Sequence, residues 1–190
     1  TASDGGGIFC TWNSSPTMTN VTISGNTASY GGGISCTWNS SPTMTNVTIS
    51  GNTASNYGGG IYCYSSSPTM TNVTISGNTA SAGAGGGISC HSSSSPTITN
   101  SIISHNTGNY GIYVDSGNPS ITYSDFYNNQ NGNFYGLDWH GVNVTTNANG
   151  DSVDAYNNIQ LDPEFVDIDN NDYHLQNWSG LIGAGTTTNA

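Results

Sequence analysis

The sequence predicts an all-β fold, a right-handed parallel β-helix (a β-solenoid), with three-strand rungs of about 26 residues and an irregular C-terminal cap. The first observation is that the segment PTMTNVTISGNTAS occurs three times unchanged, beginning at Pro16, Pro42 and Pro68. Looser copies begin at Pro96 and Pro119. The second observation is an isoleucine that keeps the same step, at Ile8, Ile34, Ile61, Ile88 and Ile112. Self-similarity at a fixed period of this size is typical of proteins that stack one structural unit on the next.

Each repeat contains three short runs in which apolar and polar residues alternate, as they do in strands. In the first repeat, the run Gly-Gly-Gly-Ile-x-Cys places Ile8 and Cys10 on one side of a strand. The other two runs are Thr-Met-Thr and Val-Thr-Ile-Ser, and crossover chirality favours a right-handed coil. The residues predicted to point inward in this rung, and at equivalent positions in the others, are Ile8, Cys10, Met18, Val21, Ile23 and Ala28.

Two series of asparagines recur once per repeat, where the chain must bend between strands. Stacked amides at such positions can bond from rung to rung, so the first series predicts an asparagine ladder and the second could form another. The first series is Asn20, Asn46, Asn72 and Asn100. The second is Asn26, Asn52, Asn78, Asn106 and Asn129. The glycine triplets supply positive φ or close backbone approach at the remaining corner.

The regular pattern ends near residue 130. We therefore expect residues 1–130 to form the regular rungs and residues 131–190 to form irregular terminal rungs and a C-terminal cap. An open solenoid end exposes an unpaired edge, so an atypical terminal segment is expected there. Both parts are expected to belong to one domain. Because the sequence begins inside a repeat, we expect a mature or trimmed form.

The charge of the chain is one-sided: it has no Lys or Arg and 11 acidic residues, ten of them at or after Asp115. A protein without basic side chains cannot neutralise phosphates, which argues against a nucleic-acid partner. The chain also lacks the polybasic segments that attract anionic lipid surfaces. No stretch approaches the roughly 18 apolar residues of a membrane span, so no membrane insertion is expected.

Short motifs carry a resemblance to known proteins. Gly-Gly-Ile and Ile-Ser-Gly-Asn, once per rung, resemble the GGxI and FxxN signatures of polymorphic outer-membrane-type repeats. The segments at 162–166 (DPEFV) and 172–175 (DYHL) resemble the C-terminal rungs of secreted bacterial right-handed β-helix proteins. The closing segment at 179–185 (SGLIGAG) lacks the proline and aspartate usual in that family. The resemblance implies the fold and a secreted or cell-surface location, but it leaves the function open because this fold hosts lyases, adhesins and binding proteins.

The clearest candidate site consists of the threonines that flank the central residue of the Thr-Met-Thr run and of its equivalents in the other repeats, as Thr17 and Thr19 flank Met18. Neighbouring rungs lie about 4.8 Å apart and residues i and i+2 about 6.7 Å apart, so these side chains would form a flat, regular grid of hydroxyls and methyls. The grid resembles the faces with which solenoid antifreeze proteins order water and join it to ice. The expected partner is therefore ice or ordered water. The predicted ice-binding residues are Thr17, Thr19, Thr43, Thr45, Thr69, Thr71, Thr97, Thr99 and Thr122.

Two alternatives stay open. Threonine is a common solvent-facing strand residue without further role, and the chain could be a cell-surface adhesin or a passenger-type stalk. The column formed by Trp12 and Trp38 suits an adhesin. The adjoining Thr/Ser column changes to Ile102 and then to Asp125, whereas the first column keeps its chemistry through Thr97 and Thr99, which favours ice binding.

Enzymatic activity is not expected. A polysaccharide lyase on this fold would need a basic residue, and a paired-carboxylate hydrolase needs two acids across a cleft. We therefore expect no catalytic residue, no cofactor and no metal, and a monomeric protein. The loop from Asp167 lacks the glycine and glutamate of a calcium-binding EF-hand. The cysteines stand one rung apart, unlike a zinc motif, and they could be buried thiols or disulfides: Cys10, Cys36, Cys63 and Cys90.

Overall fold

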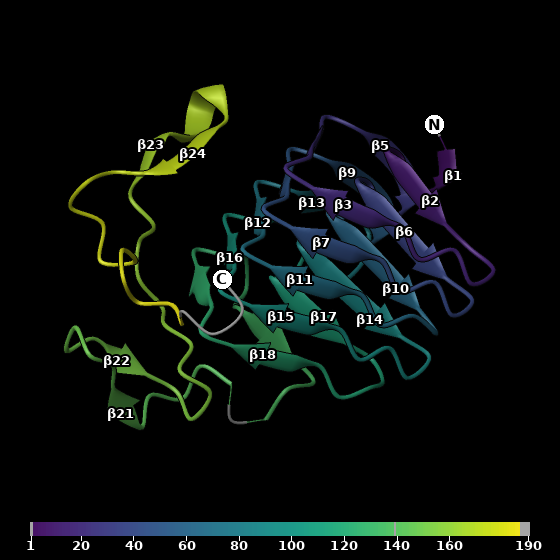
Figure 1. Cartoon of the computed structure of the whole chain (residues 1–190). Coiled ribbons are helices and arrows are strands. Elements are labelled where there is room, and N and C mark those ends of the chain that lie inside the picture. The colour runs from purple at the N-terminus through teal and green to yellow at the C-terminus, as the bar shows by residue number, and fades with distance from the viewer. Residues whose placement is uncertain (1, 139, 187–190) are drawn as a thin grey trace.

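The computed structural model describes residues 2–138 and 140–186, and these form a parallel β-solenoid (Figure 1). The rungs follow one another in sequence order, from the N-terminus at one end of the stack to residue 135. Each strand of a rung pairs in parallel with the equivalent strand of the next rung. The strands of one rung therefore belong to different sheets, and each sheet runs along the solenoid. We name the four sheets A to D.

Sheets A and B are formed by the segments before and after the glycine triplets. Sheet A contains β1 (Ala2–Asp4), β5 (Thr27–Tyr30), β9 (Thr53–Tyr57) and β13 (Thr79–Ala80). Sheet B contains β2 (Ile8–Cys10), β6 (Ile34–Thr37), β10 (Ile61–Tyr64), β14 (Ile88–His91), β17 (Ile112–Val114) and β20 (Phe134–Tyr135).

Sheets C and D are formed by the two runs of the repeated segment. Sheet C contains β3 (Thr17–Thr19), β7 (Thr43–Thr45), β11 (Thr69–Thr71), β15 (Thr97–Thr99) and β18 (Ser120–Thr122). Sheet D contains β4 (Thr22–Ser24), β8 (Thr48–Ser50), β12 (Thr74–Ser76), β16 (Ile102–Ser104) and β19 (Asp125–Tyr127).

The predicted parallel solenoid is confirmed, with one addition to the rung. Three strands were predicted per rung, and the structure adds a fourth, the Thr-Ala-Ser segment that builds sheet A. Ala28 of this segment is fully buried and pairs with Ala54 of the next rung. A side chain as small as alanine lets this strand lie close to the core without displacing its larger side chains.

The core is a single cluster that runs along the solenoid axis and takes side chains from sheets B, C and D. Equivalent residues stack in register, so Met18, Met44 and Met70 form one column. The predicted inward positions Cys10, Met18 and Ile23 are buried. Stacking identical side chains fills the interior evenly, because every rung presents the same shape to its neighbours.

The second predicted asparagine ladder is present and is the buried one, whereas the first is present only from Asn20 to Asn72. Asn100, the last predicted member of the first ladder, donates its side-chain amide to the carbonyl oxygen of Thr186 at 2.8 Å instead. From Asn26 to Asn129, each side-chain amide nitrogen donates to the Oδ1 of the next asparagine at 3.0 Å. In the outer ladder, the amides of Asn46 and Asn72 each donate to the preceding rung at 3.2 Å. The outer asparagines adopt positive φ, from 51° to 55°, at the bend between sheets C and D. Asparagine tolerates this conformation better than most residues.

The glycine triplet between sheets A and B is required by close contact between rungs. Gly31 has a φ of +63°, which disfavours L side chains. A Cβ atom on Gly32 would lie 2.5 Å from the carbonyl oxygen of Gly59 in the next rung. The corner can therefore stack at the strand spacing only if it carries no side chains.

The C-terminal segment forms two antiparallel hairpins. After β20 it forms an antiparallel hairpin of β21 (Thr145–Thr146) and β22 (Ser152–Val153). It then forms a second hairpin of β23 (Phe165–Asp167), the 3₁₀ helix η1 (Ile168–Asn170) and β24 (Asp172–Leu175), seen in yellow-green in Figure 1. Of the predicted segment 131–190, residues 139 and 187–190 lie outside the described residues.

Candidate functional site

Sheet C carries every predicted ice-binding residue and holds them in two in-register columns. Thr17, Thr43, Thr69 and Thr97 pair with one another in order, and Ser120 ends this column. The second column consists of Thr19, Thr45, Thr71, Thr99 and Thr122. Parallel strands in register place equivalent side chains about 4.8 Å apart. The structure thus brings all nine predicted threonines onto one face.

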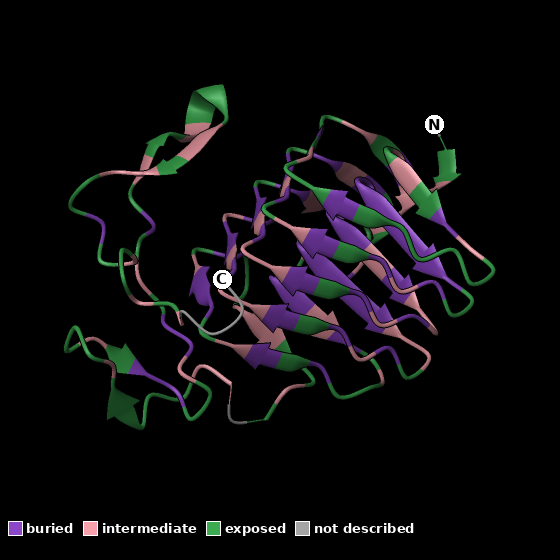
Figure 2. Ribbon diagram, in the orientation of Figure 1, coloured by how far each residue is buried: buried purple, intermediate pink, exposed green. Residues whose placement is uncertain are grey.

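The two columns differ in exposure. Members of the first column are exposed in every strand, whereas the second column changes from exposed at Thr19 to half-buried from Thr45 onward. Figure 2 shows the buried central residues of these strands between exposed and half-buried flanks. The face therefore offers hydroxyl and methyl groups to solvent on both sides of the core-facing residue.

The hydroxyls of this face are largely available to solvent. At the last two strands, the Oγ1 atoms of Thr99 and Thr122 lie 3.3 Å apart and form a hydrogen bond. In the first three strands of sheet C, the threonine hydroxyls make no hydrogen bond to another described residue. No ionisable side chain stands on any of the five strands of sheet C. Water is therefore the natural partner of these hydroxyls.

The face is held rigid on three sides. Beneath it lie the core residues Met18, Met44, Met70, Ile98 and Ile121. At the C-terminal ends of the strands of sheet C, the outer asparagine ladder joins the first three rungs. Before the N-terminal ends of these strands lies a serine ladder. In this ladder the backbone amides of Ser41, Ser67 and Ser95 donate to serine hydroxyls of the preceding rung at 2.9 Å. These contacts fix the strand spacing from which the grid derives its regularity.

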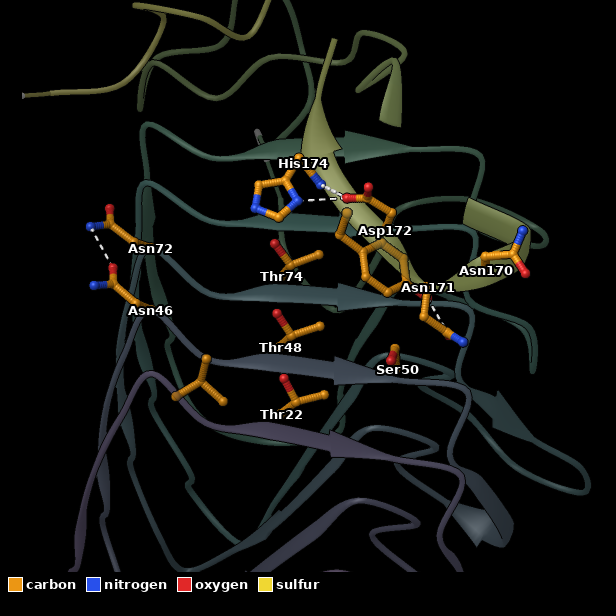
Figure 3. Close-up of a pocket in the computed structure, with 12 residues that line it drawn as sticks. Thr22, Asn46, Thr48, Ser50, Asn72, Thr74, Asn170, Asn171, Asp172 and His174 are labelled. Atoms are coloured by element: carbon orange, nitrogen blue, oxygen red, sulfur yellow. Dashed lines mark hydrogen bonds and ion pairs between the residues drawn. The ribbon is translucent and has the colours of Figure 1, made fainter. Parts of the chain in front are cut away.

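Sheet D carries the adjoining Thr/Ser columns, but the C-terminal hairpin lies over this sheet. Thr22, Thr48 and Thr74 line a polar groove of about 480 Å³ whose other wall includes Asn171 and His174 (Figure 3). Ser50 and Ser76, on the same sheet, are fully buried. Sheet D is therefore not a free, flat surface, and the sequence repeat alone could not reveal this because the hairpin lies outside the repeats.

Sheet A holds a further hydroxyl column that sequence analysis did not identify. Thr27, Thr53 and Thr79 pair in register, and Thr107 continues the column through an isolated bridge. The hydroxyls of Thr79 and Thr107 form a hydrogen bond of 2.8 Å. The repeated segment Gly-Asn-Thr-Ala-Ser could have predicted this column, because its Thr and Ser stand on both sides of an inward alanine, as in a strand. Sheet A is narrower than sheet C, however, because β13 is only two residues long.

The predicted cysteine column is present, and its four thiols are buried and unbridged. Cys10, Cys36, Cys63 and Cys90 pair in register along sheet B. A hydrogen bond with Cys36 lowers the pKa of Cys10. The pKa of Cys63 is raised well above its usual range by its hydrogen bond with Cys90 and by burial. These thiols belong to the core and do not contact the threonine face.

The acidic and histidine side chains form no common site. Asp125 is buried at the end of sheet D, where burial raises its pKa to about 8 although the backbone amide of Leu161 donates to it at 3.0 Å. His174 and Asp172 form an exposed pair at 2.6 Å on the hairpin. Asp167 caps η1 by accepting a hydrogen bond from the amide of Asn170. No cluster of three or more metal-ligating side chains occurs among the described residues.

Comparisons with known proteins agree with the architecture. Residues 6–161 match the family model described as the right-handed β-helix region. No curated protein and no solved structure matches the chain. In the described part of the chain, no helix is long and apolar enough to cross a membrane.

Proposed function

The chain belongs to the right-handed β-helix family, and from this premise we propose that it is an ice-binding protein whose ice-binding face is sheet C. One observation carries the proposal: five parallel strands present threonine or serine on both sides of a buried residue, in register and without a charged group. The family is compatible with many functions, so it is the threonine face of sheet C, and not the fold, that supports ice binding.

The proposed mechanism needs no cofactor and no catalytic group. Threonine methyls favour ordered water around them, while the hydroxyls hold that water at a regular spacing, and the ordered layer merges with the crystal. Immobilising a water molecule costs at most about 2 kcal/mol, so the cost must be spread over many sites that are already rigid. The β-branched threonine side chain adds to this rigidity because its χ1 rotation is restricted.

The absence of charge on sheet C supports the same function. A carboxylate or ammonium group binds water strongly and in its own geometry, which would compete with an ice-like arrangement. The acidic residues of the chain lie at or after Asp115, with the exception of Asp4, and none stands on sheet C. We propose that the protein acts outside the cell or at its surface, where ice would be met, as a non-enzymatic monomer.

The chain offers two other hydroxyl surfaces, and each is less suited to the function. The hairpin lies over sheet D. Sheet A has fewer strands, and its second hydroxyl column stops near Ser81, where the chain enters the turn before the next glycine triplet. Sheet C combines five strands with two hydroxyl columns, and the first of these columns is exposed in every strand.

The direct test is partition of the purified chain into slowly growing ice. The expected result is enrichment in the ice fraction over a non-binding protein of similar size, together with faceted crystals and slower recrystallisation at micromolar concentration. A protein that is excluded from ice like the control would contradict the proposal. The adhesin or stalk alternative, in which the solenoid serves as a spacer, would then be the leading explanation.

A further inference from the structure

Aromatic rings gather on the outward face of sheet B, in contrast to the hydroxyl face of sheet C. Its side chains come from the strands of sheet B and from the turns on either side of them. Ring contacts form two rows on this face: one joins Trp12, Trp38 and Tyr64, and the other joins Tyr62, His91, Tyr113 and Tyr135. The residues that define this surface, which we call the aromatic band, are Trp12, Trp38, Tyr62, Tyr64, Tyr113 and Tyr135.

Rings of the aromatic band contact rings of the next rung, and at both ends of the band they stack. At one end, the indoles of Trp12 and Trp38 lie parallel, with ring centroids 5.5 Å apart and an interplanar angle of 9°. Near the other end, Tyr113 and Tyr135 stack at 4.7 Å and 7°. Between them, the ring of His91 lies 5.4 Å from Tyr62 and 5.9 Å from Tyr113. The two rows overlap at β10, which carries both Tyr62 and Tyr64, so together they follow the solenoid axis from the first rung to β20.

These rings are not part of the core. Trp12 is 72% exposed, Trp38 49% and Tyr135 47%. Scattered exposed apolar residues are normal on protein surfaces, but a contiguous exposed aromatic patch marks a binding surface. The band extends over successive rungs, so its length suits an extended partner.

The tryptophans are not required by the turn that carries them. Trp12 and Trp38 have a φ of +54°, which is unusual for a bulky side chain. The same turn position is occupied by Ser65 in the third rung and Ser92 in the fourth, both with a φ of +50°. Serine adopts the same turn conformation elsewhere in the chain, so the backbone does not require tryptophan here. The two indoles therefore matter for the exposed surface that they form.

The polar groups around the aromatic band are uncharged or acidic. The chain has no Lys or Arg, and the carboxylates beside the band belong to Asp115, 3.6 Å from His91, and to Asp4, whose charge acts on Tyr62. Burial raises the pKa of Tyr62 to about 12, so its phenol stays neutral. The phenol oxygens of Tyr62, Tyr64 and Tyr113 make no hydrogen bond to another described residue, which leaves them free to bind hydroxyls. An anionic partner would meet no opposite charge on this face.

We propose that the aromatic band binds an uncharged polysaccharide chain that lies along the solenoid axis. The apolar C–H faces of sugar rings pack against aromatic rings, and the sugar hydroxyls match phenol and serine groups. The absence of positive charge argues against uronate or sulfated glycans, since their anionic groups would stay unpaired. This site is separate from the ice-binding face, so either function can hold without the other.

Affinity electrophoresis of the whole chain in native gels tests the proposal, because the protein migrates as an anion of formal net charge −11. The gels contain dextran, laminarin or galactomannan as neutral probes, or alginate as an acidic one. Retardation by at least one neutral polysaccharide, and none by alginate, is expected. The double variant Trp12→Ser/Trp38→Ser, which uses the residue found at Ser65, should weaken that retardation at least fivefold.

Two controls make the outcome decisive. Trp178→Ser removes an exposed tryptophan outside the band and should leave retardation unchanged. The double variant should keep the circular dichroism spectrum and the ice partition of the wild type. Lack of retardation by every neutral probe, or equal retardation of the double variant, would overturn the proposal. So would concentration-dependent self-association that the double variant abolishes, because the band would then be an interface between two copies of this chain.

Discussion

The side-chain nitrogen of Asn52 donates a hydrogen bond to the Oδ1 of Asn78 at 3.0 Å, and the backbone amide of Asn52 donates to the same oxygen at 3.0 Å. Asn52 also donates to the carbonyl oxygen of Ile23 in the preceding rung at 2.9 Å. One buried amide therefore ties three successive rungs together. Because sheet C lies on the same rungs, the spacing of its threonines depends on this ladder.

Loss of an inner-ladder amide should be costly. In the variant Asn78→Ala, the amides of Asn52 lose their acceptor and the carbonyl of Ile49 loses its donor, all in a buried site. Each unsatisfied buried group costs about 1–3 kcal/mol, so we expect a loss of about 3 kcal/mol or more in the free energy of unfolding. Urea unfolding followed by circular dichroism measures this loss.

The outer ladder supplies the matched control in the same rung. Asn72→Gly keeps the positive φ of this position and removes an exposed hydrogen bond. We expect a loss of about 1 kcal/mol or less. Equal losses for Asn72→Gly and Asn78→Ala would contradict the assignment of the inner ladder as the main tie between rungs.

Stability should fall as pH rises from about 4 to about 8 because of Asp125. Burial raises the pKa of this carboxyl to about 8 in the folded chain, whereas an unfolded aspartate has a pKa of about 3.9. Between these values the folded state holds a proton that the unfolded state has released, so the free energy of unfolding decreases as pH rises through this window. The slope from this one group is on the order of 1 kcal/mol per pH unit.

The variant Asp125→Asn isolates this effect. An amide keeps an oxygen that can accept from the backbone of Leu161 but does not ionise. Unfolding free energies of wild type and variant should diverge between pH 5 and pH 8, with the variant the less pH-dependent. Parallel curves would mean that Asp125 is ionised in the folded protein across this range.

The buried carboxylate of Asp154 should be essential for keeping the C-terminal segment folded. It accepts hydrogen bonds from the backbone amides of Gly141, Tyr156 and Asn158 and from the side chain of Asn158. Asp154→Ala leaves these buried donors without their acceptor, and we expect amide hydrogen exchange after residue 136 to accelerate at least tenfold. Exchange in sheets B and C before that point should change far less, and uniform acceleration would show that the cap and the rungs unfold as one unit.

Thiol reactivity should follow position along the cysteine column. The hydrogen bond with Cys36 lowers the pKa of Cys10, and Cys10 stands in the first strand of sheet B, next to the open end of the stack. Cys63 lies between two rungs, and its pKa is raised. At pH 8, iodoacetamide should therefore modify Cys10 at least tenfold faster than Cys63, as followed by peptide mass spectrometry. Equal rates would indicate global opening as the only route to these thiols.

The repeats made most of the solenoid predictable from sequence. Identical side chains at a fixed period imply stacking, and alternation within each run identifies inward residues such as Met18 and Ile23. The fourth strand was harder to predict because its inward residue, Ala28, is small and lies in a segment rich in Ser, Thr and Asn, which also suits a turn. Its short, weakly apolar pattern carries little periodic signal.

Two features of the surfaces could not be derived from the repeat. The hairpin that lies over Thr48 comes from residues far along the chain, and nothing in its sequence specifies which sheet it contacts. The aromatic band combines rings from different positions in successive rungs, such as Trp38 and Tyr64. Only the folded chain shows that these rings meet.

Ice partition of the variant Thr69→Tyr, compared with that of Ser55→Tyr, tests whether sheet C is the face that binds ice. Thr69 is exposed on β11, the middle strand of sheet C, whereas Ser55 is exposed on β9 of sheet A. A bulky ring at the centre of the threonine grid should hold the ice lattice away from the face. We expect at least a tenfold loss of ice enrichment for Thr69→Tyr and wild-type enrichment for Ser55→Tyr. Wild-type enrichment for Thr69→Tyr would contradict the assignment of sheet C as the ice-binding face.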